Sequence, residues 1–140
     1  MDNIVFEKIW EDDCIFEIKV TATSKYVTAY QKFYIDEKRL SDISQRIVQY
    51  SKFFKEPCYV QTGEKKGNFT PAFSMNISNI DMSGHVKIEV DIEISDIEDR
   101  SHRCLYYIKT DLGSLEIFGK KIERLCHSKV GSKVWLHQIS

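Results

Sequence analysis

The apolar residues of this chain follow two periods, one typical of helices and one typical of strands. Behind Asp36, and again behind Asp111, apolar residues recur every three or four positions and so line one face of a helix. These residues are Leu40, Ile43, Ile47 and Tyr50 in the first case and Leu115, Phe118, Ile122 and Leu125 in the second. Each aspartate can accept hydrogen bonds from first-turn N–H groups. The pattern therefore predicts amphipathic helices over about 37–54 and 112–126.

Residues 85–94 alternate between polar and apolar side chains without a fault. An antiparallel strand with one buried and one solvated face produces this pattern, so Glu89, Asp91 and Glu93 are expected to face water. The residues expected to face the core are Val86, Ile88, Val90, Ile92 and Ile94. Further strands are predicted over 3–10, 14–20, 26–35, 58–62, 69–78 and 103–109, with a weaker one over 133–139. In the second of these, Cys14 is expected on the apolar side.

The predicted elements occur in the order β-β-β-α-β-β-β-β-α, followed by a tail. We expect residues 1–140 to form a single α+β domain, with the tail from about residue 127 docked or partly irregular. The expected architecture is an antiparallel sheet of about six to seven strands with the two helices packed on one face. Gly113 and Gly119 are expected to weaken the second helix.

The net charge of −1 argues against a chain that is basic overall and binds nucleic acid. Charge is uneven locally, however, because residues 81–99 contain seven acids and residues 100–140 contain eight lysines or arginines. These charges can pair across neighbouring strands, which is the interpretation we favour. The alternative is an acidic patch that a basic partner recognises.

The expected location is the cytoplasm. Cys14, Cys58, Cys104 and Cys126 form no C-x-x-C pair, so we interpret them as reduced thiols. The N-terminus lacks the basic start and apolar run of a signal peptide. No segment reaches the roughly 20 apolar residues of a membrane span, so no membrane partner is expected.

No motif predicts a catalytic residue, a cofactor or a metal site. The four histidines show no metal-ligand spacing, and phosphate-binding and nucleophile motifs are missing from the sequence. Cys126 and His127 are adjacent on a predicted helix, where neighbours do not face one another. Asp91 and Glu93 stand in one solvated row rather than across a cleft, as a glycosidase would need. The chain is therefore not expected to be an enzyme.

Tyr26, Tyr30 and Tyr34 are separated by even numbers of positions along one predicted strand, so they share a face. They can cover the sheet as core residues. They can equally form an interaction surface, because tyrosine is enriched at protein interfaces.

Several features follow one another in a definite order along residues 14–126. They are the strand over 16–20, Leu40, the run over 84–90, and Asp111 with Leu115, Phe118 and Leu125. In this order they resemble the WapI-like immunity proteins of bacterial polymorphic toxin systems. The matching motifs are structural rather than catalytic. Gly113, Gly119 and the tail depart from the pattern of that family.

The resemblance implies a cytoplasmic, non-enzymatic protein that binds and neutralises a cognate toxin domain, with a nuclease as the expected toxin. An acidic face could steer the encounter with a basic cleft and block it. The expected partner-binding residues are Glu89, Asp91 and Glu93, with Tyr26 and Tyr30 as anchors.

A second hypothesis belongs to another class. The chain would then be a small self-associating accessory module that forms a homodimer through an exposed strand edge or through the tail around Trp135. An enzyme stays in consideration only if a pocket holds a cysteine or histidine with a perturbed pKa.

Overall fold

The computed structural model describes residues 2–53, 56–62, 72–79, 81–94 and 102–137. Within these residues the elements follow the predicted order. A short 3-10 helix and a last strand come after the second α-helix. The elements are β1 (Asn3–Glu11), β2 (Phe16–Thr23), β3 (Thr28–Ile35), α1 (Glu37–Phe53), β4 (Cys58–Thr62), β5 (Ala72–Asn79), β6 (His85–Ile94), β7 (His102–Asp111), α2 (Leu112–Arg124), η2 (Leu125–His127) and β8 (Lys133–His137). The predicted strand start at 69 and the predicted strand end at 139 lie outside the described residues.

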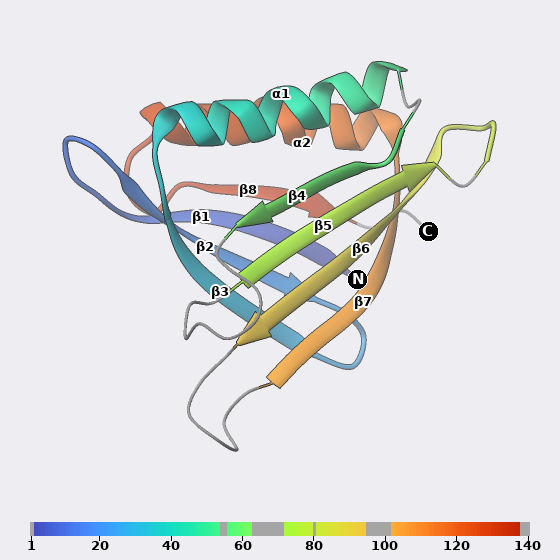
Figure 1. The fold of residues 1–140 in the computed structure, drawn as a ribbon, viewed down its shortest axis with the longest axis horizontal. Coiled ribbons are helices and arrows are strands. Elements are labelled where there is room, and N and C mark those ends of the chain that lie inside the picture. The colour runs from blue at the N-terminus through green and yellow to red at the C-terminus, as the bar shows by residue number, and fades with distance from the viewer. Residues whose placement is uncertain (1, 54–55, 63–71, 80, 95–101, 138–140) are drawn as a thin grey trace.

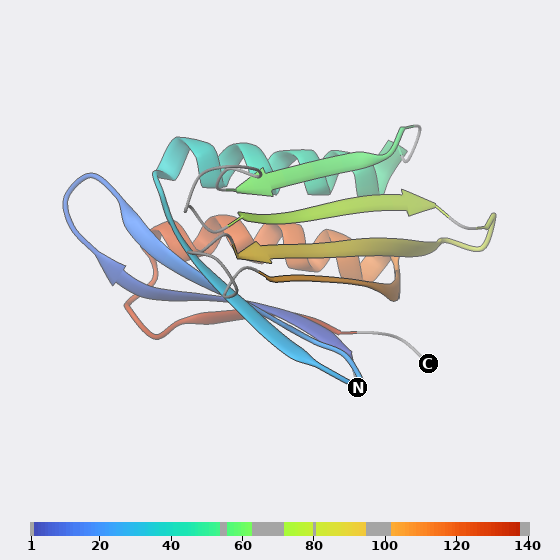
Figure 2. The same cartoon turned by 60° about the horizontal axis from the view of Figure 1, so that its bottom comes forward.

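The described strands form two antiparallel sheets of four strands each, not one sheet of six to seven strands (Figure 1). The first sheet has the order β3-β2-β1-β8, and the second has the order β4-β5-β6-β7. Figure 2 shows the strands of the two sheets running in different directions. The α+β class and the antiparallel pairing are confirmed. The single sheet was wrong because one buried face per strand suits two facing sheets as well as one sheet under helices.

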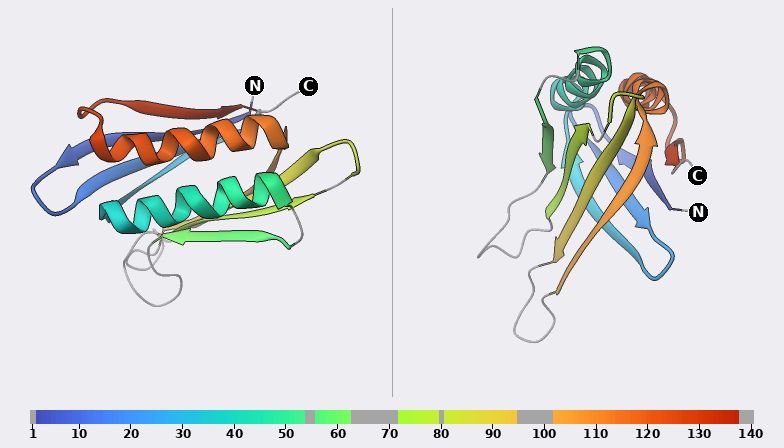
Figure 3. Two further views of the ribbon diagram at one scale, coloured as in Figure 1. Left: turned by 90° about the horizontal axis from the view of Figure 1, so that it is seen from above. Right: turned by 90° about the vertical axis from the view of Figure 1, so that its right-hand side faces the viewer.

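The helices do not cover one face of a sheet. They lie side by side along one side of the molecule, with both sheets beneath them (Figure 3). α1 contacts β4 of the second sheet, while α2 contacts β8 of the first sheet and β7 of the second. The outer faces of both sheets are therefore left without a helix over them.

Phe6 is at the centre of the core. Its ring makes edge contacts with Phe33, Phe73 and Phe118 at centroid distances of 6.5, 5.9 and 5.5 Å. These partners come from β3, β5 and α2, so one side chain joins both sheets and a helix. The buried apolar cluster around it takes residues from all the described strands and both α-helices.

Both predicted helix caps are confirmed. The Asp36 carboxylate accepts from the Arg39 N–H at 2.8 Å, and the Asp111 carboxylate accepts from the Ser114 N–H at 2.6 Å. Each aspartate therefore satisfies a donor that the helix itself leaves unpaired.

Gly119 has a role that helix propensity does not reveal. A Cβ at this position would lie 2.9 Å from Ile47 Cγ2 and 3.0 Å from Val48 Cγ2, both on α1. The bare backbone lets the two helices approach closely, and the Ser44 hydroxyl donates to the Gly119 carbonyl at 2.6 Å. Gly119 lowers the intrinsic stability of α2 but permits its packing.

The alternation of β6 is confirmed on its apolar side, where Val86, Ile88, Val90 and Ile92 are buried. The side chain of Ile94 lies outside the described residues. The expectation that Asp91 faces water was wrong, because it is 2% exposed. Cys14 was also misplaced, since it is exposed before β2 begins at Phe16. No helix within the described residues is long and apolar enough to cross a membrane.

Candidate functional site

The three expected acidic residues share the outer face of β6 but are largely engaged by neighbours. Arg103 on β7 donates to the Asp91 carboxylate twice, from Nε at 3.0 Å and from Nη2 at 2.6 Å. The carboxylate raises the pKa of Arg103 through these bonds. Such a bidentate pair accounts for a buried aspartate on a sheet surface.

Glu89 accepts a hydrogen bond from the Tyr107 hydroxyl at 3.0 Å, and this bond raises the pKa of Tyr107. Lys87 Nζ lies 5.1 Å from the centre of the Tyr107 ring. Lys109 is the cross-strand neighbour of Lys87 on β7. The predicted pairing of charges across strands is thus confirmed for Asp91 and Arg103. Basic side chains also lie next to the other acidic residues of this face.

The two expected tyrosine anchors belong to the other sheet. Tyr30 is on the outer face of β3, and Tyr26 is 87% exposed in the turn before it. The inner faces of the sheets share one core, so their outer faces point away from each other. The structure therefore does not bring Tyr26 and Tyr30 together with Glu89 and its neighbours.

An aromatic row crosses the outer face of the first sheet. In register from β8 to β3, the row consists of Trp135, Val5, Thr21 and Tyr30. Trp10 and Tyr34 lie on the same face two rows further along, with their rings in edge contact at 6.0 Å. Trp10, Tyr30, Tyr34 and Trp135, hereafter the aromatic face, are each 43–63% exposed. Interface composition favours such residues where they are held on a rigid sheet.

A β-bulge explains why Trp10 joins this face. The β1–β2 register shifts between Lys8 and Trp10. Strict alternation would place both side chains on the same side, but Lys8 is fully buried and Trp10 is 43% exposed. Alternation along 3–10 therefore could not reveal the aromatic face, although the spacing of Tyr30 and Tyr34 did indicate part of it.

The row between Tyr30 and Tyr34 carries charge. In register from β8 to β3 it consists of Lys133, Glu7, Lys19 and Lys32. Lys19 Nζ lies 4.8 Å from the centre of the Tyr30 ring, in cation–π geometry. Charged groups, more of them basic than acidic, thus lie within the aromatic face, between Tyr30 and Trp135 on one side and Trp10 and Tyr34 on the other.

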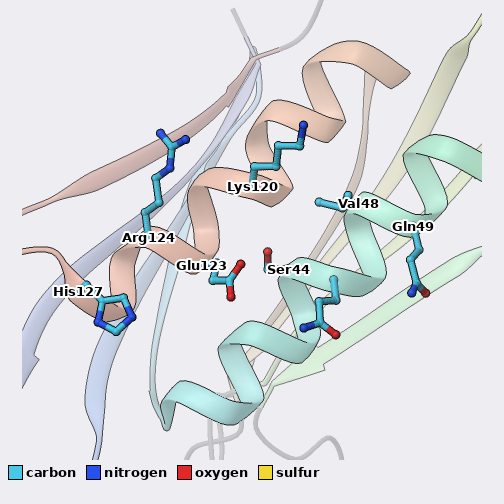
Figure 4. Close-up of a pocket in the computed structure, with 8 residues that line it drawn as sticks. Ser44, Val48, Gln49, Lys120, Glu123, Arg124 and His127 are labelled. Atoms are coloured by element: carbon cyan, nitrogen blue, oxygen red, sulfur yellow. The ribbon is translucent and has the colours of Figure 1, made fainter.

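A groove of 570 Å³ runs between α1 and α2 (Figure 4). Its lining consists of Ser44, Gln45, Val48, Gln49, Lys120, Glu123, Arg124 and His127. Glu123 accepts from the Ser41 hydroxyl at 3.1 Å, and His127 Nε2 lies 3.4 Å from Glu37 Oε1. Because the Ser44 hydroxyl donates to a main-chain carbonyl, no serine of this groove is activated by the histidine.

Cys58 and Cys126 do not have the features of nucleophiles. Burial raises the pKa of Cys58, and burial together with Glu37 and Glu123 raises the pKa of Cys126. A catalytic cysteine needs the opposite shift. Among the described residues, no group of three or more histidine, cysteine, aspartate or glutamate side chains is arranged to hold a metal ion.

Another groove, of 410 Å³, lies between α2 and β8. It is lined by Ser114, Ile117, Lys121, Lys133, Trp135, Leu136 and His137. Two lysines and a histidine therefore surround an apolar strip, and one wall is a strand at the edge of its sheet.

Comparison of the chain with protein-family models, with curated proteins and with solved structures gives no match. The resemblance to WapI-like immunity proteins therefore stays a prediction.

Proposed function

We propose that this protein is a non-enzymatic immunity protein that neutralises a toxin domain by binding it through the aromatic face. The observation that carries the proposal is the uncovered row of Trp135 and Tyr30 together with the Trp10–Tyr34 pair. Aromatic residues lose little side-chain entropy on binding and supply a large contact area. The groups that face the grooves suit binding better than catalysis.

The charges on the outer faces of the two sheets do not favour any one class of toxin. Each outer sheet face carries both signs, with Arg103 on Asp91 in the second sheet and lysines beside Glu7 in the first. Electrostatic steering into a basic nuclease cleft would need an excess of acids. The nuclease class consequently rests on the resemblance alone.

The first experiment is growth of bacteria that express the toxic domain encoded beside this protein, with and without the protein. Rescue of growth and a one-to-one complex on a sizing column are expected. Failure of both, with each protein folded, would leave the proposal without support.

A second experiment locates the binding surface. Trp10→Ala combined with Tyr34→Ala is expected to weaken the complex by at least ~30-fold, because a central aromatic anchor contributes about 2 kcal/mol or more. Tyr107→Ala, an exposed tyrosine of the second sheet, serves as the matched control and should change affinity little. Equal effects of the two variants would contradict the assignment.

A third experiment tests the acids. Glu89→Lys combined with Glu93→Lys spares Asp91, whose reversal would also break the buried pair with Arg103. We expect toxin affinity to change less than about threefold at physiological salt. A loss as large as that of the aromatic variant would move the binding surface to the second sheet.

Self-association remains the alternative, and strand edges favour it. On β4 the edge is covered, since Arg39 and Arg46 of α1 donate to the Gln61 and Tyr59 carbonyls at 2.9 and 2.6 Å. The edges of β3, β7 and β8 lie at the ends of their sheets. Light scattering decides this alternative, because a concentration-independent dimer mass would favour an accessory module and a monomer would exclude it.

A further inference from the structure

We infer that the groove between β8 and α2 binds an extended, acidic segment of a partner protein, which adds to the first sheet as a fifth strand beside β8. This surface differs from the aromatic face, with which it shares only Trp135. Its occupant is a linear peptide, whether or not the folded partner of the aromatic face is a toxin.

The hydrogen bonds of β1 show which main-chain groups of β8 are directed outward. Lys8 N–H donates to the Ser132 carbonyl at 3.0 Å, and the Lys8 carbonyl accepts from Gly131 N–H at 2.7 Å. Because main-chain groups alternate along a strand, Phe6 and Ile4 also face β8, opposite Val134 and Leu136.

The residues of β8 that alternate with Val134 and Leu136 therefore point their N–H and C=O groups away from β1. These residues are Lys133, Trp135 and His137, all at the free edge of the sheet. The His137 carbonyl confirms the direction, since it accepts from the Thr110 hydroxyl of β7 at 3.2 Å. The main-chain groups of Lys133 and Trp135 can then pair with an added strand.

The helix supplies the second wall. Ser114, Ile117 and Lys121 recur at helical spacing, so they share one side of α2 and line the 410 Å³ groove. Figure 3 shows β8 running alongside α2. Ile117 and Trp135 are 55% and 47% exposed, and alternate apolar side chains of a bound strand could cover them.

The charge of the groove selects the occupant. Of the described residues that line it, Lys121, Lys133 and His137 carry or can acquire positive charge, and no carboxylate is among them. Glu7 is the cross-strand neighbour of Lys133 but does not line the groove. A second copy of β8 would add its own Lys133 and His137 to a groove that already has two lysines, so an acidic strand is the better occupant.

The probe is a capped peptide of about eight residues that alternates glutamate and valine. It is titrated into the ¹⁵N-labelled protein and followed by NMR. Shifts are expected at the amides of Lys133, Trp135, Ile117 and Lys121, with slowed hydrogen exchange at the Trp135 main-chain N–H. A version with proline at its centre should bind weakly, because it cannot complete the ladder.

Charge reversal supplies the specificity test. Lys121→Glu combined with Lys133→Glu is expected to weaken binding of the acidic peptide by about tenfold and to favour a lysine–valine peptide. Lys32→Glu combined with Lys109→Glu, on the outer faces of the two sheets, is the matched control and should bind the acidic peptide nearly as well as the unaltered protein. Circular dichroism verifies that each variant is folded.

Three results would overturn the inference. The first is no shift at β8 at millimolar peptide, and the second is equal binding of the proline peptide, which would indicate charge attraction alone. The third is a protein dimer whose own β8 amides shift with protein concentration, since a second copy would then occupy the groove. None of these results depends on whether the toxin experiment succeeds.

Discussion

Lys8 is a fully buried lysine whose removal should destabilise the protein measurably. Its ammonium donates to the Ser128 carbonyl at 2.9 Å and to the Cys126 carbonyl at 3.3 Å, and it lies 2.5 Å from a Glu11 carboxylate oxygen. All three donors of the ammonium are thus used. The residue ties β1 to η2 and to the start of the segment that follows it.

Lys8→Met keeps most of the apolar stem and removes the charge. Two charge-assisted hydrogen bonds to carbonyls contribute about 1.5 kcal/mol or more each. Relief from the cost of burying an ammonium offsets part of this sum. Glu11 is 43% exposed, so its carboxylate stays hydrated when its partner is removed. We therefore expect a loss of about 2–3 kcal/mol in the free energy of unfolding.

Urea denaturation followed by circular dichroism measures this loss as a lower midpoint with an unchanged slope. Lys32→Met, at an exposed position on β3, is the matched control and should cost less than about 0.5 kcal/mol. Glu11→Gln should cost less than about 1 kcal/mol because the pair is half open to water. A Lys8→Met protein as stable as the unaltered one would refute the assignment of a stabilising role to these bonds.

Three further predictions concern single positions. Gly119→Ala should lower the free energy of unfolding by roughly 1–2 kcal/mol, since overpacking against α1 outweighs the gain in helix propensity. Gly113 is exposed, so Gly113→Ala should raise the free energy of unfolding by about 0.5–1 kcal/mol. Urea denaturation midpoints compare the two variants. The Tyr106 hydroxyl is buried without a hydrogen-bond partner among the described residues, so Tyr106→Phe should not lower the melting temperature, and a clear decrease would contradict this. The His85 side chain bonds Asp81 at 2.6 Å and lowers the pKa of that carboxyl below its ordinary value of 3.8. The stabilisation from this bond is present above that ordinary pKa and is lost as pH falls through the folded pKa, so Asp81→Asn should flatten the acid side of the stability curve.

Local features of the fold could be predicted because they depend on residues near in sequence. The caps at Asp36 and Asp111 and the apolar helix faces behind them follow from spacing alone. The division into two sheets could not be predicted, because it depends on which strands pair over long distances. A strand such as β6 shows the same alternation in either arrangement.

The candidate site was predicted less completely for the same reason. Tyr30 was found from its spacing, but Trp10 and Trp135 join it only when β1, β3 and β8 assemble. Asp91 was expected in water because its partner, Arg103, is on another strand. Lys8 gave no signal, since a lysine in an alternating strand ordinarily reaches solvent.

The pairing of β1 with β8 has a consequence for the order of folding. Asn3 is the cross-strand neighbour of His137, so every element from β2 to β8 must be made before β1 gains its second partner. Until then, the edge of β1 that pairs with β8 is unpaired, and Lys8 lacks its carbonyl acceptors at Cys126 and Ser128. Closing so long a loop slows folding. A nascent chain that stalls before β8 therefore presents an open strand edge that chaperones or neighbouring chains can bind.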